Sequence, residues 1–198
     1  MAHIDYFYTL LSPFTYMAGD RPEQIAAKHG ATLTYRPADF PAIFAETGGL
    51  PVPKRHPFRQ EYRLMELPRL ARRAGKPLTL HPKHWPCDAT QATLSVLAAG
   101  AGGADVGALS RAFLSACWAE ERDISDSGTI AEILSKHEVD ATALDSEAQR
   151  PTYEANTKMA LENGVFGAPF FVVDGGERFW GQDRLDYLDD HLESLSNV

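Results

Sequence analysis

The first residues able to do chemistry stand in YTLLSPFTYMAGDR, at positions 8–21, where Ser12 precedes Pro13. Proline is accepted in the first turn of a helix, because its missing N–H would be unpaired there anyway. Ser12 is then the natural N-cap, with a hydroxyl that accepts a hydrogen bond from the first turn. The unpaired N–H groups of a helix start also stabilise a nearby anion. The turn is therefore either a plain helix cap or part of a ligand site.

A second group of candidates is basic or metal-binding. Lys54, Arg55 and Arg59 follow GGLPVP, and they fit either a solvated basic face or partners for a carboxylate. His81 and His84 in LHPKHWP are three residues apart, as two metal ligands on one helix could be. No third ligand is close, however, and the two prolines argue against a helix. We therefore expect no metal site.

The cysteines and tryptophans favour structural roles. Cys87 and Cys117 are far apart in the sequence, and neither belongs to a Cys-x-x-Cys motif. Neither a disulfide framework nor a local redox pair is indicated. We expect both thiols to be reduced and Cys117 to lie in a core. The tryptophans are expected to be packing residues, although Trp180 could line an aromatic pocket.

The overall composition is that of an ordinary globular chain. Its 198 residues are 44% hydrophobic and 23% charged, which suits one domain, or one domain with a large insertion. The net charge of −8 argues against a duplex nucleic-acid binder, which needs a basic face. Neither a signal-peptide pattern nor an apolar stretch of ~18 residues is visible. We expect a cytoplasmic protein that binds neither nucleic acid nor membranes.

The elements around Ser12 are predicted to form a strand–helix–strand unit. Residues 3–9 are rich in Ile, Tyr and Phe, which predicts a buried strand. Residues 20–23 read D-R-P-E, the pattern of a capping box, and predict a second helix that ends at Gly30. Another strand is expected near residues 32–36. The two strands should therefore pair in parallel.

The middle of the chain is predicted to be a loop followed by helices. Residues 37–57 are rich in proline and glycine, which indicates a long ordered loop. The first helix after it has Tyr62, Met65 and Leu70 on one side, and Pro68 should bend it. Two later helices repeat mainly apolar residues at spacings of three and four. These residues are Val106, Leu109, Phe113 and Cys117, then Ile130, Ile133, Leu134 and His137.

Strand character returns only near the C-terminus. Residues 170–173, a Gly-Gly turn at 175–176 and residues 178–180 predict a β-hairpin. Asp183 is expected to cap a last amphipathic helix. The fold class is therefore α/β, with a βαβ half and a ββα half that enclose a large all-helical insertion.

A βαβ half followed by a ββα half is the arrangement of the thioredoxin fold. Residues 1–38 and 155–198 would form the thioredoxin-like domain, and residues 39–154 the loop and helical insertion. Pro169 in GVFGAPFFVV resembles the cis-proline that faces the site turn of thioredoxin-like proteins. Together with LSPFTY and FWGQDRLDYL, it resembles the DsbA-like branch. Within that branch the chain is similar to the 2-hydroxychromene-2-carboxylate isomerases, relatives of the kappa-class glutathione transferases, over essentially its whole length.

The resemblance implies a glutathione-dependent isomerase of aromatic degradation. Such enzymes interconvert 2-hydroxychromene-2-carboxylate and trans-o-hydroxybenzylidenepyruvate, with glutathione as a recycled cofactor. The glutathione thiolate adds to the conjugated double bond, the single bond so formed rotates, and elimination restores the alkene. Ser12 would donate a hydrogen bond to this thiolate, at the position where a redox relative carries its attacking cysteine. The resemblance also implies a homodimer acting on a small aromatic substrate.

The same resemblance implies which residues contact the rest of glutathione and the substrate. The backbone of Ala168, just before Pro169, would pair with the cysteinyl main chain of glutathione as an added strand does. The γ-glutamyl end would meet Gln182 and Asp183, and Asp88 stands where several relatives carry asparagine. The candidates for the substrate carboxylate are Lys54, Arg55 and Arg59.

One departure from the family pattern concerns Arg59, which precedes Tyr62 by three residues where related transferases have lysine. This keeps the charge but alters the geometry. Two rival functions stay open. One is a glutathione transferase or peroxidase on the same scaffold, and the other is a non-catalytic DsbA-like module that binds glutathione or a peptide. A disulfide oxidoreductase is disfavoured, because the site turn has no cysteine.

Overall fold

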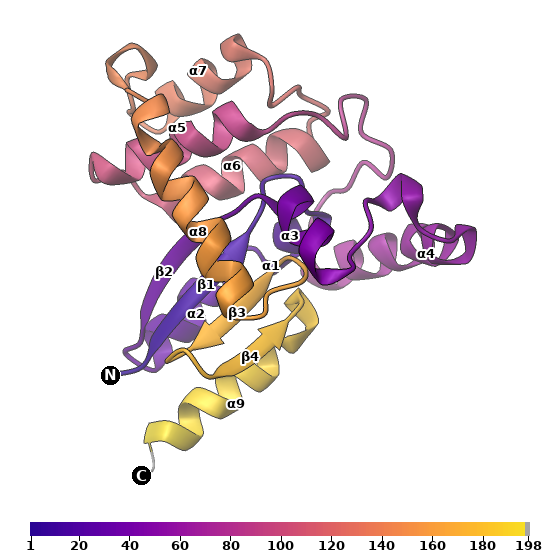
Figure 1. The fold of residues 1–198 in the computed structure, drawn as a ribbon. Coiled ribbons are helices and arrows are strands. Elements are labelled where there is room, and N and C mark those ends of the chain that lie inside the picture. The colour runs from indigo at the N-terminus through magenta and orange to yellow at the C-terminus, as the bar shows by residue number, and fades with distance from the viewer. Residues whose placement is uncertain (197–198) are drawn as a thin grey trace.

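A mixed four-stranded sheet lies at the centre of the computed structural model, which describes residues 1–196 (Figure 1). The strands follow the order β2-β1-β3-β4. β1 runs parallel to β2 and antiparallel to β3, and β3 and β4 form the predicted hairpin. Both predicted pairings are therefore confirmed. The strands are β1 His3–Tyr8, β2 Thr32–Pro37, β3 Phe170–Val173 and β4 Glu177–Trp180.

Helices surround this sheet, and short 3₁₀ turns connect several of them. The α-helices are α1 Pro13–Ala18, α2 Arg21–Lys28, α3 Phe40–Thr47, α4 Pro57–Ala74, α5 Thr90–Ala101, α6 Val106–Trp118, α7 Ser127–Lys136, α8 Arg150–Glu162 and α9 Leu185–Ser196. The 3₁₀ turns are η1 Val52–Lys54, η2 Ala141–Ala143, η3 Glu147–Gln149 and η4 Gln182–Arg184. Among the described residues, no helix is both long and apolar enough to cross a membrane.

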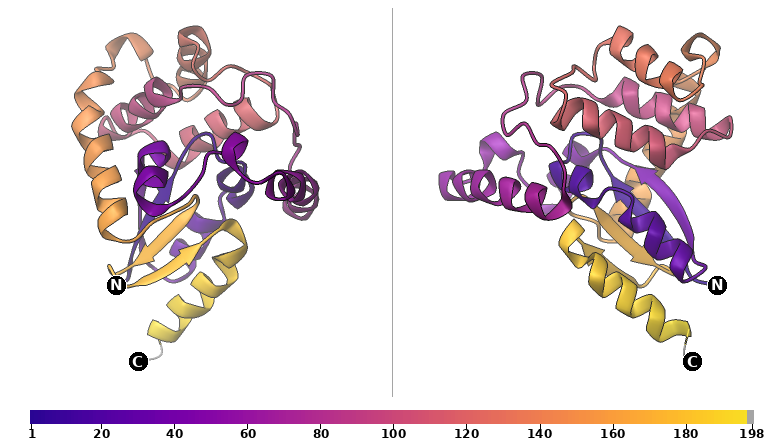
Figure 2. Two further views of the ribbon diagram at one scale, coloured as in Figure 1. Left: turned by 45° about the vertical axis from the view of Figure 1, so that its right-hand side comes forward. Right: turned by 180° about the vertical axis from the view of Figure 1, so that it is seen from behind.

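Two apolar cores lie on opposite faces of the sheet, because successive side chains of a strand point to opposite sides. Phe7 and Phe170 enter the smaller core, which α3 and α8 cover. Tyr6 and Phe171 enter the larger one, which includes residues of α1, α2, α5, α6, α7 and α9. Figure 1 shows α5, α6 and α7 gathered above the sheet, and Figure 2 shows α4 projecting at one side.

One helix lies where the sequence predicted only a loop. Within residues 37–57 the chain forms α3, and the carboxylate of Asp39 caps it by accepting from the N–H of Ala42 at 3.1 Å. Pro41 lies in the first turn, where proline is tolerated. Phe40 and Ile43 are buried against the sheet. The loop prediction was wrong because a first-turn proline was taken as a sign of irregular structure.

The buried side of α4 also differs from the prediction. Tyr62 and Met65 are 59% and 48% exposed, whereas Arg63, Leu67 and Ala71 are buried. Pro68 lies inside this continuous helix. The predicted phase was wrong because a charged residue, Arg63, occupies the inner side.

Other local predictions have mixed outcomes. Cys117 is buried as expected, and both cysteines are free. The capping box at residues 20–23 does not form, because the Asp20 side chain makes no cap hydrogen bond and instead accepts from Gln24. Glu23 pairs with Arg111 of α6.

Candidate active site

Ser12 lies where β1 passes into α1, and it caps that helix as predicted. Its backbone is extended, with φ of −87° and ψ of 119°. Its Oγ accepts a hydrogen bond from the Thr15 N–H at 3.2 Å, and its carbonyl accepts from the Tyr16 N–H at 3.0 Å. Only 8% of Ser12 is exposed. The serine is therefore fixed at the start of α1 by its own helix.

The same hydroxyl also reaches the loop before β3. Ser12 Oγ donates a hydrogen bond to the carbonyl of Ala168 at 3.2 Å. The peptide between Ala168 and Pro169 is cis, as the motif predicted. The turn after β1 and the cis-proline loop thus meet although they are far apart in the sequence. One hydroxyl links them.

The η4 turn joins this group through the backbone. The N–H of Gly181 donates to the carbonyl of Pro169 at 2.9 Å, and Gly181 has a φ of +106°, which favours glycine. Gln182 and Asp183 follow in η4, which contacts α1. The predicted capping role of Asp183 is wrong, since this residue lies within η4 and its carboxylate pairs with Arg184 at 2.9 Å.

An aromatic surface borders the cis-proline loop. Trp180 and Phe166 are 54% and 43% exposed, and their ring centroids are 4.8 Å apart. The indole of Trp180 lies so close to Gly167 that a Cβ at that position would collide with Nε1. Trp180 is therefore more exposed than an ordinary packing residue. An aromatic ligand could stack on this surface.

Two residues beside Ser12 were missed by the sequence interpretation. Thr15 Oγ1 is buried and has no hydrogen-bond partner within residues 1–196. Trp85 donates from Nε1 to the carbonyl of Leu11 at 3.0 Å, so its indole packs against the site turn. A signal for Thr15 was present, because it follows Ser12 at the spacing of the two cysteines in a Cys-x-x-Cys motif.

The predicted basic residues lie in η1, just after it and in the first turn of α4, the helix that packs against α1. Lys54 and Arg59 are exposed. Arg55 is partly buried and donates from Nε to the carbonyl of Leu50 at 2.7 Å. Burial, and to a lesser degree the charge of Arg59, lower the pKa of Arg55. Their assignment to a carboxylate stays a prediction, and the next guanidinium along the helix, Arg63, was missed.

Asp88 and His84 make local contacts. Asp88 is exposed, and its carboxylate accepts from the Thr90 N–H at 3.0 Å at the start of α5. Hydrogen bonds from Thr90 lower the pKa of Asp88. His84 lies 3.5 Å from a carboxylate oxygen of Asp123. Within the described part of the chain no three His, Cys, Asp or Glu side chains are grouped as metal ligands. A contact of Asp88 with glutathione stays a prediction.

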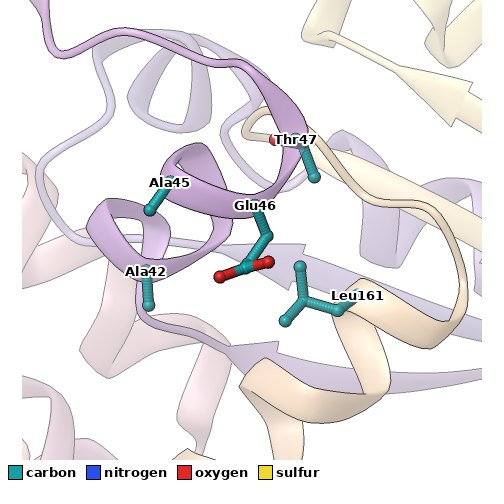
Figure 3. Close-up of a pocket in the computed structure, with 5 residues that line it drawn as sticks. All are labelled: Ala42, Ala45, Glu46, Thr47 and Leu161. Atoms are coloured by element: carbon teal, nitrogen blue, oxygen red, sulfur yellow. The ribbon is translucent and has the colours of Figure 1, made fainter.

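A separate pocket of about 660 Å³ lies between α3 and α8 (Figure 3). Figure 3 shows the carboxylate of Glu46 pointing toward Leu161 across the gap. α3 and α8 cover the face of the sheet that carries Phe7, whereas α1 packs on the other face. The pocket therefore does not belong to the Ser12 site. Its lining residues are Ala42, Ala45, Glu46, Thr47 and Leu161.

The strand order, and a cis-proline that faces the start of α1, define a thioredoxin-fold protein with serine in its site turn. The family model of the DSBA-like thioredoxin domain matches residues 3–193. The chain therefore belongs to the DSBA-like thioredoxin domain family.

Individual relatives within this fold extend over almost the whole chain. The 2-hydroxychromene-2-carboxylate isomerase of Sphingobium xenophagum is 29% identical over 96% of this chain and 97% of its own length. The enzyme of the same name from Pseudomonas putida is 27% identical over 97% of this chain and 95% of its own length. A solved 2-hydroxychromene-2-carboxylate isomerase structure has a TM-score of 0.82 at 25% identity, covering 98% of this chain and 96% of that one. The predicted resemblance is confirmed.

More distant neighbours show the fold alone. The cytosolic disulfide reductase DsbM from Pseudomonas aeruginosa has a TM-score of 0.70 at 19% identity, and the match covers 98% of this chain and 97% of that one. The thioredoxin-like fold with its added helices is therefore confirmed, and this neighbour decides nothing about chemistry.

Proposed function

We propose that the protein is a glutathione-dependent isomerase that interconverts 2-hydroxychromene-2-carboxylate and trans-o-hydroxybenzylidenepyruvate. Full-length similarity to enzymes of that name supports an isomerase. The observation that carries the proposal is the hydrogen bond between Ser12 Oγ and the Ala168 carbonyl. It joins a hydroxyl donor to the backbone that would bind a peptide-like cofactor. We further propose that the enzyme acts as a cytoplasmic homodimer.

The geometry at Ser12 fits a cofactor with both a thiol and a peptide backbone. Bound glutathione would supply a thiolate nucleophile for reversible addition to the conjugated double bond. Ser12 has one hydroxyl proton, which it donates to Ala168. If that proton turned toward a sulfur anion, the Ala168 carbonyl would be free to accept from a backbone N–H, as in an added strand. The two requirements are therefore compatible.

The Ser12 hydroxyl would stabilise the glutathione thiolate more than the dipole of α1 would. A free thiol titrates near ~8.5, so only a few per cent is ionised at neutral pH. A hydrogen bond to a charged group contributes about 1.5–3 kcal/mol, equivalent to a thiol pKa lower by about one to two units. α1 has only six residues. We therefore assign most of the thiolate stabilisation to Ser12 rather than to the helix dipole.

The neighbouring groups suit the two ends of the reacting complex. Gln182 and Asp183 in η4 offer an amide and a carboxylate, which would bind the γ-glutamyl end through its ammonium and carboxylate groups. The exposed rings of Phe166 and Trp180 offer a stacking surface for the aromatic part of the substrate. Both assignments rest on position and chemistry.

The test is an activity comparison with purified protein and glutathione. Three substrates would be assayed: 2-hydroxychromene-2-carboxylate, a generic electrophile and a hydroperoxide. We expect turnover of the first, with an absolute requirement for glutathione. Turnover of only the other two would establish a transferase or peroxidase instead. Glutathione binding by calorimetry without turnover would indicate a non-catalytic module, and insulin reduction would indicate a disulfide reductase.

A further inference from the structure

Arg63 is a buried cation with unpaired guanidinium nitrogens in the part of the chain that the structure describes. It lies on the inner side of α4 and is only 7% exposed. Nε and Nη2 are both buried, and neither has a hydrogen-bond partner in the described part of the chain. Leaving buried donors unpaired is costly, and more so when the group is charged. The guanidinium therefore has unused capacity for an acceptor.

Two indole rings hold this guanidinium in place. Its Cζ lies 5.0 Å from the centroid of the Trp85 ring and 5.7 Å from that of Trp118. Aromatic faces attract a cation, and this attraction offsets part of its loss of hydration. Rings do not replace the in-plane acceptors that a guanidinium fork requires. The guanidinium is therefore held by two ring faces, while its buried Nε and Nη2 stay unpaired within residues 1–196.

Trp85 connects Arg63 to the Ser12 site. Its Nε1 donates to the carbonyl of Leu11, the residue before Ser12, at 3.0 Å. One indole thus contacts the site turn at its edge and Arg63 at its ring. The helices that carry the two residues, α1 and α4, pack against each other. Trp85 therefore links Arg63 to the turn that carries Ser12.

Further positive charge accompanies Arg63. Arg55, Arg59 and Arg63 recur at every fourth position, and the first of these is partly buried. Burial, and to a lesser degree the nearby charge of Arg55, lower the pKa of Arg63 to about 10. Arginine side chains in general stay cationic at neutral pH. An anion bound between Arg55 and Arg63 would relieve their mutual repulsion.

We propose that Arg63, assisted by Arg55, binds the carboxylate of the aromatic substrate beside the Ser12 site. The inference rests on the proposed function and names its specificity-determining residue. A planar carboxylate matches the guanidinium fork, which can donate two parallel hydrogen bonds. Lys54 and Arg59 are exposed and would attract the anion on its approach rather than hold it. The neutral part of the substrate would extend toward Ser12.

Glutathione also carries a carboxylate at its glycine end, so the experiment must separate the two sources. Calorimetric titration, with glutathione present, would compare chromone-2-carboxylate with its uncharged methyl ester. Wild-type protein is expected to bind the acid about 10- to 100-fold more tightly than the ester. Arg63→Gln should lose that preference while its affinity for the ester stays unchanged. Arg63→Lys should keep part of it, because the charge remains but the fork does not.

A matched control and three contrary outcomes complete the test. Arg73→Gln removes a charge from the exposed end of the same helix and should leave both affinities unchanged. Equal binding of acid and ester by wild-type protein would overturn the proposal, as would an undiminished preference in Arg63→Gln. If Arg63→Gln lost affinity for glutathione but not for γ-glutamylcysteine, which lacks the glycine, Arg63 would be assigned to the glycine carboxylate instead.

The measurement needs no turnover, so it is independent of the proposed reaction. Absence of isomerase activity with an intact preference for the acid would refute the isomerase and leave the carboxylate site standing. Circular dichroism would report whether Arg63→Gln is folded. If Arg63→Gln is not folded, the comparison of acid and ester binding in wild-type protein and in Arg63→Lys still tests the proposal.

Discussion

Ser12 uses one hydroxyl for two different bonds. Its oxygen accepts from the Thr15 N–H, and its proton goes to the Ala168 carbonyl, both at 3.2 Å. A helix cap requires only the acceptor. The proton is available for another acceptor, and a sulfur anion is a stronger acceptor than a neutral carbonyl. Capping and catalysis are therefore compatible roles of the same residue.

Ser12→Ala should separate these two roles. We expect the free energy of unfolding to fall by ~1 kcal/mol, because the cap is lost. The pKa of bound glutathione, followed by the ultraviolet absorbance of the thiolate, should rise, and the isomerisation rate at neutral pH should fall about tenfold or more. Asp126→Ala is the matched control, since Asp126 caps α7 through the Thr129 N–H at 2.7 Å. Equal loss of activity in both variants would refute a chemical role for Ser12.

Ser12→Cys tests the same position from the opposite direction. A thiolate there would attack oxidised glutathione, form a mixed disulfide and release one reduced glutathione. We expect a mass increase of one glutathionyl group that dithiothreitol reverses, together with loss of isomerase activity until reduction. Cys87 and Cys117 provide the internal control, because burial raises the pKa of their thiols to about 11 and about 12. Modification of wild-type protein to the same extent would contradict the prediction.

At the scale of elements, α9 is held to α2 by ion pairs at the rim of a buried contact. Asp186 accepts from Arg21 at 2.6 Å, and Asp189 accepts from Lys28 at 2.8 Å and from His29 at 2.6 Å. Leucines of α9 fill the space beneath. Because β4 and η4 lead directly into α9, this contact also supports the Gln182–Asp183 side of the site.

Asp189→Asn should therefore change how stability depends on pH. Hydrogen bonds from Lys28 and then His29 lower the pKa of Asp189. Its contribution is present in full above the unfolded value near ~3.9, and it is lost as pH falls from there through the folded pKa. The variant should be less stable than wild type by under ~1 kcal/mol at pH 7. Urea unfolding should show this gap shrinking toward pH 2, with the exposed Asp190→Asn as control; a constant gap would exclude the mechanism.

The sequence predicted the strands well and two of the helices poorly, for identifiable reasons. β1, β2 and the β3–β4 hairpin have apolar runs bounded by turns, and this signal is local. α3 was hidden by Pro41 in its first turn. The phase of α4 was misjudged because Arg63 is buried by two tryptophans distant in sequence. Hydrophobic periodicity does not contain this information.

In the candidate site too, local features were predictable from the sequence and long-range contacts were not. Ser12 was identifiable as a cap because Pro13 follows it in the first turn of the helix, but its contact with Ala168 joins positions 156 apart. Only the resemblance to thioredoxin-like proteins predicted that the cis-proline loop faces the site turn. Arg63 and Thr15 were missed because they are distinguished by buried polar atoms that have no hydrogen-bond partner among the described residues. That property becomes visible only once the surrounding side chains are placed.

At the scale of the whole molecule, the helical insertion and the sheet share one core. The larger apolar cluster contains Tyr6 and Phe171 of the sheet as well as Phe113 of α6 and Ile133 of α7. A buried hydrogen bond of 2.7 Å joins the hydroxyls of Tyr8 and Ser110. The predicted division at residues 38/39 and 154/155 describes segments of the chain. The packing gives no reason for these segments to unfold separately.

Leu109→Ala tests this shared core. Leu109 lies in α6, in the inserted segment, and it is fully buried. Its truncation should cost ~2–5 kcal/mol, because the transfer free energy is lost and a cavity remains. Hydrogen exchange followed by mass spectrometry should show that β1 and β3 lose protection together with α6 and α7, in one cooperative transition.

Leu195→Ala, at a residue 45% exposed on α9, is the control and should change little. If only α5, α6 and α7 lost protection in Leu109→Ala, the insertion would be an independent unit. The distinction matters for the site, because Ser12 caps a helix whose Tyr16 and Met17 belong to the shared core. With one core, a destabilised insertion would loosen the start of α1 and reduce activity, although no residue of the site had changed.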